Sequence, residues 1–157
     1  MQDFLDAIKN RFALPEQDIR TYSPLTLAYI GDGIYEVVVR TVMVQQANRP
    51  TNALHKMTTQ YVKAPAQAQM LLGLKEELTE EEADVARRGR NAKPYTTAKN
   101  ASRAEYHKAT GFEALLGYLY LTGRSERMLE LIQKGMELVA RESDANVKAK
   151  GESNHGR

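Results

Sequence analysis

The chain has 157 residues, of which 42% are hydrophobic and 27% charged, with a formal net charge of +2 and no cysteine. This length suits one domain, and the composition excludes disordered and collagen-like chains, disulfides, thiolate metal sites and cysteine nucleophiles. No apolar run approaches the roughly 18 residues of a membrane span and no export signal opens the chain, so we expect a cytoplasmic protein without membrane contact.

Apolar residues recur at spacings of three and four, and alternating strand patterns of useful length are lacking, which predicts an all-α fold. A short helix is expected over residues 3–12. A long helix is expected over residues 25–44, because the pair Ser23-Pro24 provides a cap and a first-turn proline. Gly31 and Gly33 lie inside this helix, where each costs about 1 kcal/mol relative to alanine. We therefore expect a close helix contact or a ligand beside them.

Several shorter helices are expected in the rest of the chain. Thr79 and Glu82 form a capping box at the start of one of them. Gly, Asn and Pro predict a loop over residues 88–97. The expected helices cover residues 51–62, 65–74, 79–87, 100–108, 111–121 and 125–141. We expect one domain over residues 1–142 and a polar, disordered tail over residues 143–157.

Asp32 interrupts one of the most apolar stretches of the sequence, AYIGDGIYEVVV. A carboxylate is costly to bury in such surroundings unless it is paired or binds a cation. Glu36 lies one turn later on the same face of the expected helix, and we expect it to have a supporting or structural role. Asp32 could belong to a cation site, accept hydrogen bonds at a helix kink, or pair with an arginine such as Arg40.

Glu113 repeats this anomaly in the apolar segment TGFEALLGYLYL. Two carboxylates on two hydrophobic helices could converge on Mg²⁺, which prefers oxygen ligands and keeps several of its waters. Such a site would suit cleavage of a phosphodiester. Alternatively, Glu113 could be a first-turn acid that the helix dipole favours.

Charges of opposite sign occupy neighbouring blocks of the sequence. Residues 75–84 are mainly acidic, and residues 85–108 are mainly basic. This asymmetry indicates a surface that faces a polyanion, and the expected loop RRGRNAK suits contacts to a phosphate backbone. A solvated basic loop is the alternative. The candidate RNA-binding residues are Arg87, Arg88, Arg90, Lys93, Lys99 and Arg103, with Lys108 continuing the series.

Two segments carry a resemblance to a known family. LAYIGDGIYE resembles the signature helix of ribonuclease III catalytic domains, and TGFEALLGYLYL resembles the second acidic segment of that family. The closer likeness, over residues 15–140, is to Mini-ribonuclease III, the compact form without a double-stranded-RNA-binding domain. The resemblance implies a ribonuclease III-like helical bundle in which Asp32 and Glu113 are catalytic and hold Mg²⁺.

The sequence also departs from the larger family. Ala28 stands where that family has a glutamate one turn before Asp32, and Thr110 stands where it has an aspartate three residues before Glu113. Half of the expected carboxylate cluster is therefore missing. Weaker cation binding, or a cation that keeps more of its waters, is the physical expectation.

The resemblance further implies an endoribonuclease that cleaves double-stranded RNA and leaves 5′-phosphate products. It implies a homodimer with one cleavage centre per protomer, and a role in maturation of the large-subunit ribosomal RNA precursor. The apolar stripe of Ile30, Ile34, Tyr35 and Val38 is a candidate dimer contact, although packing inside the monomer explains such stripes more often. The competing hypothesis is a catalytically weak or inactive RNA-binding or ribosome-assembly module of the same fold.

Overall fold

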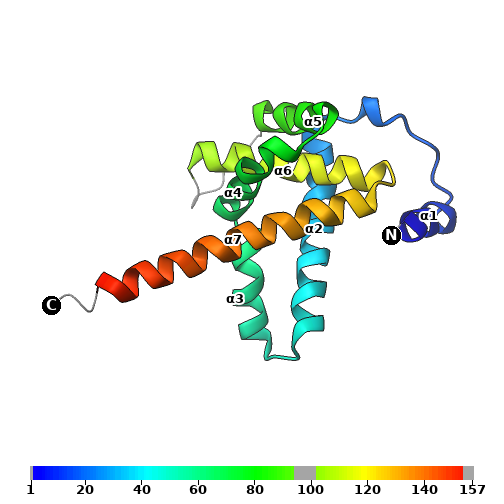
Figure 1. Cartoon of the computed structure of the whole chain (residues 1–157). Helices are drawn as coiled ribbons and strands as arrows, with labels where there is room; N and C mark the ends of the chain where they lie inside the picture. Colours follow the sequence, from blue (N-terminus) through cyan, green and yellow to red (C-terminus); the bar gives the residue numbers. More distant parts are fainter. Residues whose placement is uncertain (1, 94–101, 154–157) are drawn as a thin grey trace.

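The computed structural model describes residues 2–93 and 102–153, and every regular element in these ranges is helical (Figure 1). The all-α prediction is confirmed. Of the helices described, none combines the length and the apolar character that a membrane crossing requires. The elements are α1 (Gln2–Arg11), a 3₁₀ turn (Ile19–Thr21), α2 (Pro24–Gln46), α3 (Thr51–Val62), α4 (Ala64–Leu74), a 3₁₀ turn (Lys75–Glu77), α5 (Glu80–Asn91), α6 (Arg103–Leu121) and α7 (Ser125–Ser153).

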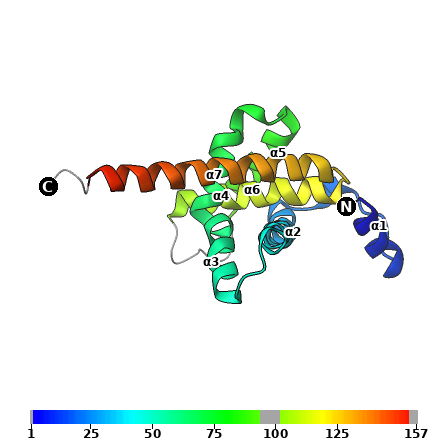
Figure 2. The same ribbon diagram turned by 60° about the horizontal axis from the view of Figure 1, so that its bottom comes forward.

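The central helix is α6, which packs against α2, α4, α5 and α7. Figures 1 and 2 both show α7 running back along α6 and α2 crossing beneath it. Phe112, Leu115 and Leu119 of α6 are fully buried, and Tyr35 of α2 meets the Phe112 ring edge-on at 5.7 Å between centroids. Burial of each such side chain contributes about 1.5–3 kcal/mol. This core fixes the position of α6, and hence of Glu113 beside Phe112.

The capping signals in the sequence mark two helix starts correctly. The Ser23 hydroxyl accepts a hydrogen bond from the backbone N–H of Thr26, with Pro24 in the first turn of α2. Thr79 and Glu82 form both bonds of the capping box at the start of α5. These side chains satisfy N–H groups that have no partner within the helix.

The expected loop after residue 87 begins later than predicted. Helix α5 continues through Asn91, so Arg88 and Arg90 lie in its last turn. Gly89 does not break the helix, because it permits close packing instead: a Cβ there would lie 2.7 Å from the Cβ of Ala114 on α6. Arg87, Arg88 and Arg90 therefore lie on a helix and not in a loop.

The predicted break between residues 108 and 111 is also absent, and α6 is continuous across it. Gly111 lies at the same crossing, where a Cβ would come within 2.6 Å of the carbonyl oxygen of Ala86 on α5. Both glycines therefore serve close helix packing.

The last helix is longer than expected. Helix α7 continues through Ser153 rather than ending near residue 141, and its end projects away from the body in Figures 1 and 2. Residues 143–153 are thus helical, while residues 154–157 lie outside the described part. Alanine, lysine and glutamate are good helix formers, and no proline interrupts the segment.

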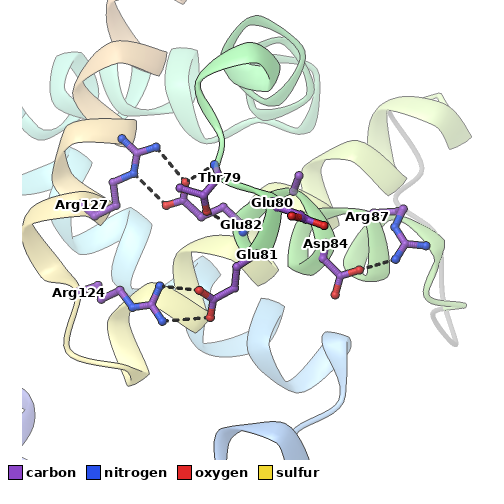
Figure 3. A pocket seen from close by; sticks show the side chains of 9 residues that line it. Thr79, Glu80, Glu81, Glu82, Asp84, Arg87, Arg124 and Arg127 are labelled. Atoms are coloured by element: carbon purple, nitrogen blue, oxygen red, sulfur yellow. Dashed lines mark hydrogen bonds and ion pairs between the residues drawn. The ribbon is translucent and has the colours of Figure 1, made fainter.

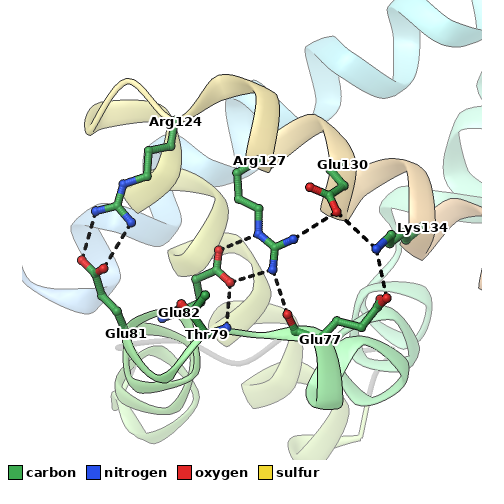
Figure 4. A network of polar contacts seen from close by, with 8 residues as sticks. All are labelled: Glu77, Thr79, Glu81, Glu82, Arg124, Arg127, Glu130 and Lys134. Atoms are coloured by element: carbon green, nitrogen blue, oxygen red, sulfur yellow. Dashed lines mark hydrogen bonds and ion pairs between the residues drawn. The ribbon is translucent and has the colours of Figure 1, made fainter.

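The acidic block near the start of α5 docks onto α7. Glu82 is 2% exposed and accepts two hydrogen bonds of 2.9 Å from Arg127 (Figure 4). Those bonds hold the pKa of Glu82 below its ordinary value. The neighbouring pairs are Glu81–Arg124 at 3.1 Å and Glu77–Lys134 at 3.0 Å. These contacts attach α5 and the 3₁₀ turn before it to α7 and the residue that precedes α7.

A cleft of about 970 Å³ lies along this network, lined by Thr79 to Asp84 together with Arg87, Arg124 and Arg127 (Figure 3). Most of its acids pair with arginines: Asp84 with Arg87, Glu81 with Arg124 just before α7, and Glu82 with Arg127 of α7. Because the acids already have cationic partners, the cleft is part of the structural framework and not a candidate cation site.

Candidate active site

Helices α2 and α6 touch backbone to backbone where they cross. A Cβ at Gly31 would lie 1.8 Å from the carbonyl oxygen of Glu113, and a Cβ at Gly117 would lie 1.9 Å from the carbonyl oxygen of Leu27. Only glycine fits at such distances. The close contact expected beside Gly31 is therefore present. Gly33 differs, because no described atom outside the nearby backbone lies within 4 Å of a Cβ placed there.

This crossing brings together the two carboxyl groups singled out in the sequence. Asp32 directly follows Gly31, and Glu113 is the residue whose carbonyl oxygen lies against Gly31. Asp32 is exposed and Glu113 is half-buried. The two side chains lie within reach of a hydrogen bond, in which a protonated Glu113 would be the donor and Asp32 the acceptor. Asp32 and Glu113 thus form one acidic pair drawn from two helices.

Both members of the pair have a raised pKa. Burial, with the adjacent charge of Asp32 and the bond to it, raises the pKa of Glu113 to about 8. Burial and the charge of Glu36 raise the pKa of Asp32, although the hydrogen bond from Glu113 opposes this. Two carboxyl groups this close cannot both ionise easily without a nearby positive charge. The pair therefore retains a proton at neutral pH when no cation is bound.

A cleft of about 370 Å³ opens at the pair. Ala28 and Thr110, the two departures from the family's carboxylates, both border it. Among residues 2–93 and 102–153, no group of three or more His, Cys, Asp or Glu side chains could hold a metal ion. A cation here would therefore have two carboxylate partners and would rely on water and neutral oxygens for the rest.

Glu36 has its own partner. Arg40, one turn further along α2, donates a hydrogen bond of 2.7 Å to it. Arg40 is thus engaged with Glu36, and the alternative in which it pairs with Asp32 is wrong. The supporting role expected of Glu36 agrees with this pairing and with its effect on the pKa of Asp32.

Gln67 of α4 also borders the cleft, although no feature of the sequence selects it. Its side chain is 3% exposed, and its Nε2 donates a hydrogen bond of 2.8 Å to the carbonyl oxygen of Val62. In the sequence it is one of two glutamines among small apolar residues, APAQAQ. Only the packing of α4 against α6 makes it a site residue.

Most of the basic candidates meet at a second cleft of about 760 Å³, between the end of α5 and the start of α6. It is lined by Arg90, Asn91, Lys93, Arg103, Ala104, His107 and Lys108. Arg88 is exposed nearby on α5, whereas Arg87 pairs with Asp84. Lys99 lies outside the described residues. The cleft has the charge and the exposure that phosphate contacts require.

The apolar stripe predicted as a dimer contact divides between the core and the surface. Tyr35 and Ile34 are 0% and 7% exposed, so they pack inside the protomer and are not available to a partner. Ile30 and Val38 are half-buried against the same core. The dimer-contact prediction was wrong for Ile34 and Tyr35, because the side of α2 that carries them faces α6 of the same protomer. Its free apolar side chains are Tyr29, Val37 and Val44, which are 83%, 56% and 54% exposed.

Comparison with known proteins gives a consistent result. The ribonuclease III domain family matches residues 25–124. A Mini-ribonuclease 3 of Thermoanaerobacter sp. (strain X514) is 46% identical over 132 residues, which cover 84% of this chain and 93% of that protein. A Mini-ribonuclease 3 of Symbiobacterium thermophilum is 49% identical over 121 residues, covering 77% and 93%. A crystal structure of a Fusobacterium nucleatum protein superposes with a TM-score of 0.70 at 30% identity, covering 78% of this chain and 98% of that one.

Proposed function

The chain belongs to the ribonuclease III family, in its Mini-ribonuclease III branch, and is an endoribonuclease; on that premise we propose that it cuts double-stranded RNA with Mg²⁺ held by Asp32 and Glu113. The observation that carries this proposal is the meeting of the two carboxyl groups at one cleft. Residues 1–142 would form the nuclease domain. The substrate would be the large-subunit ribosomal RNA precursor in the cytoplasm, with 5′-phosphate products.

The residues at the cleft fit a hard divalent cation. Two carboxylates, the Thr110 hydroxyl and the side-chain oxygen of Gln67 give the cleft oxygen atoms that can bind Mg²⁺ or the waters around it. The raised pKa of Glu113 shows that no positive charge compensates the ionised carboxylate there, and a bound cation would provide that positive charge. When bound, Mg²⁺ activates a water for attack on phosphorus and offsets charge on the phosphate.

The side chains of the protein would have two roles, to hold the cation and to bind the RNA backbone. Asp32 and Glu113 hold the cation, directly or through water, at a distance from each other that the glycine crossing fixes. Arg90, Lys93 and Arg103 bind the RNA backbone at the second cleft. Double-stranded RNA is recognised mainly by its shape, phosphates and 2′-hydroxyls, so contacts of this kind suffice to position it.

One assay separates the enzyme from the alternative, a module that binds RNA without cutting it. Purified protein is incubated with long double-stranded RNA in Mg²⁺, with and without excess EDTA, and products are resolved by electrophoresis. We expect cleavage that EDTA abolishes. Binding without cleavage would support the alternative, and cleavage that persists in EDTA would remove the metal from the proposal.

The second cleft predicts a salt-dependent affinity. Replacing Arg88, Arg90 and Lys93 with glutamine removes three cations, and each phosphate left without a cationic partner should make the slope of log affinity against log salt shallower by about 0.9. Binding of a catalytically inactive Asp32→Asn protein to duplex RNA is measured between low and moderate salt. Replacing Lys148 and Lys150, which are exposed near the projecting end of α7, is the matched control. Equal slopes in both variants would show that RNA binds at a different surface of the protein.

A homodimer through the exposed face of α2 is the second part of the proposal. Tyr29, Val37 and Val44 are large apolar side chains left exposed on one helix. Gly33 lies among them with open space above it, so a second backbone could approach closely there. Symmetric pairing of this face with itself would bury the apolar side chains of both copies.

We expect Val37→Asp to convert the protein from dimer to monomer at micromolar concentration, because the interface would have to bury two new charges. Analytical ultracentrifugation measures the change. Val147→Asp is the control, since Val147 is 69% exposed on the projecting part of α7. A Val37→Asp protein that sediments as the wild type does would exclude this face as the contact.

A further inference from the structure

Gln67 carries a buried oxygen for which the described residues offer no hydrogen-bond donor. The residue is 3% exposed, and its Oε1 is among the buried side-chain atoms without a partner. Leaving a buried acceptor unsatisfied destabilises a fold, because the group has lost its bonds to water without gaining new ones. Such an atom calls for an explanation, and a bound water or ion is one of the common ones.

The orientation of the Gln67 amide follows from its other hydrogen bond. The carbonyl oxygen of Val62 can only accept, so the atom that faces it at 2.8 Å must be the Nε2 donor. Val62 ends α3, and its carbonyl is one of those left free by the end of that helix. Gln67 therefore satisfies the end of α3 with its nitrogen, and its oxygen is held in a fixed position.

The position of Gln67 links this oxygen to the acidic pair. Gln67 borders the same cleft of about 370 Å³ as Asp32 and Glu113, and that space is large enough to hold several waters. With only two carboxylates at the cleft, a hydrated cation would keep several waters, each of which needs an acceptor. The Thr110 hydroxyl also borders the cleft and donates its proton to the carbonyl of Tyr106 at 3.0 Å, so its oxygen can accept from a second such water.

We propose that Gln67 is a positioning residue whose Oε1 accepts a hydrogen bond from a water in the hydration shell of the divalent cation at Asp32 and Glu113. The inference rests on the proposed function, because it needs a cation at that pair. Gln67, a neutral side chain on α4, would thus accept a hydrogen bond from a metal-bound water, as a third carboxylate at the cleft otherwise could. Outer groups of this kind change metal affinity by about 10–100-fold when they are removed.

The experiment compares Gln67→Met with Gln69→Met. Methionine keeps the approximate volume of glutamine and removes its polar atoms. Gln69 lies on the same helix and also has a buried side-chain atom without a partner, Nε2, but it does not border the cleft. Binding of Mn²⁺ alone is measured by titration calorimetry without RNA, and thermal unfolding is measured in EDTA.

We expect Gln67→Met to weaken Mn²⁺ binding about tenfold or more. The melting temperature in EDTA should fall as well, because the Val62 carbonyl loses the donor that Nε2 provides. Gln69→Met should bind Mn²⁺ as the wild type does. A role confined to the fold would lower the melting temperature in EDTA and leave the Mn²⁺ affinity of the folded protein unchanged, and this result would overturn the inference. If the wild type binds no Mn²⁺, the proposed cation site fails as well, so the two failures are distinguishable.

A second measurement covers the case in which Gln67→Met does not fold. In the wild-type protein, the side-chain amide NMR signals of Gln67 should shift on addition of Mg²⁺ by more than those of Gln69, because the carbonyl of the same amide gains a hydrogen bond. Equal or absent shifts in a protein that binds Mg²⁺ would overturn the assignment.

Discussion

Asp32→Asn is expected to lower the rate of cleavage by at least about a hundredfold while the protein keeps its fold. Asparagine has nearly the same shape and can still accept the hydrogen bond from Glu113, but it removes the negative charge that would hold the cation. Asp32 is exposed, so the core loses nothing. Single-turnover cleavage of a duplex RNA measures the rate, and circular dichroism follows thermal unfolding.

Glu36→Gln is the matched control for that experiment. It removes a carboxylate one turn away on the same helix, which pairs with Arg40 and does not border the cleft. We expect it to cut within a few-fold of the wild-type rate. An Asp32→Asn protein that cuts as fast as Glu36→Gln would mean that the acidic pair is not the active centre.

Gly31→Ala is expected to destabilise the protein by about 3 kcal/mol, because the new Cβ would lie 1.8 Å from the carbonyl oxygen of Glu113. The atom it meets is backbone, so α2 and α6 must move apart along a contact that supports the core. A loss of this size lowers the melting temperature of a chain this long by roughly 6–12 °C. Cleavage should fall as well, since the same movement separates Asp32 from Glu113.

Gly33→Ala provides the contrast two residues further along the same helix. No clash is present in the protomer, and alanine favours the helix by up to about 1 kcal/mol. In a dilute, monomeric protein we therefore expect the melting temperature to stay the same or to rise. Equal melting temperatures for Gly31→Ala and the wild type would show that the helix crossing tolerates a side chain.

Local sequence signals were sufficient for some elements and misleading for others. Ser23 and Thr79 marked helix starts because their caps are made within a few residues of the chain. Gly89 was part of a predicted loop and Gly111 of a predicted helix start, yet both lie inside helices. Their role depends on a second helix that is distant in sequence, so the local pattern carried no sign of it.

The same distinction applies to the site. Asp32 and Glu113 could be selected from the sequence because each is a carboxylate in apolar surroundings, which is unusual by itself. Gln67 could not, since its unpartnered oxygen and its place at the cleft arise only after α4 packs against α6. The charge asymmetry indicated a polyanion surface, but it did not show that Glu77, Glu81 and Glu82 of the acidic block pair with Lys134, Arg124 and Arg127.

The proton held between Asp32 and Glu113 makes hydrogen ions competitors of the metal. Glu113 ordinarily ionises near pH 4.5 but does so near pH 8 in the folded chain. Its contribution to the stability of the metal-free fold is therefore complete below the first value and is lost as pH rises through the second. A cation entering at neutral pH must expel the proton. Apparent affinity should therefore climb with pH and level off above about 8, and calorimetry in buffers of different ionisation enthalpy would count the hydrogen ions released.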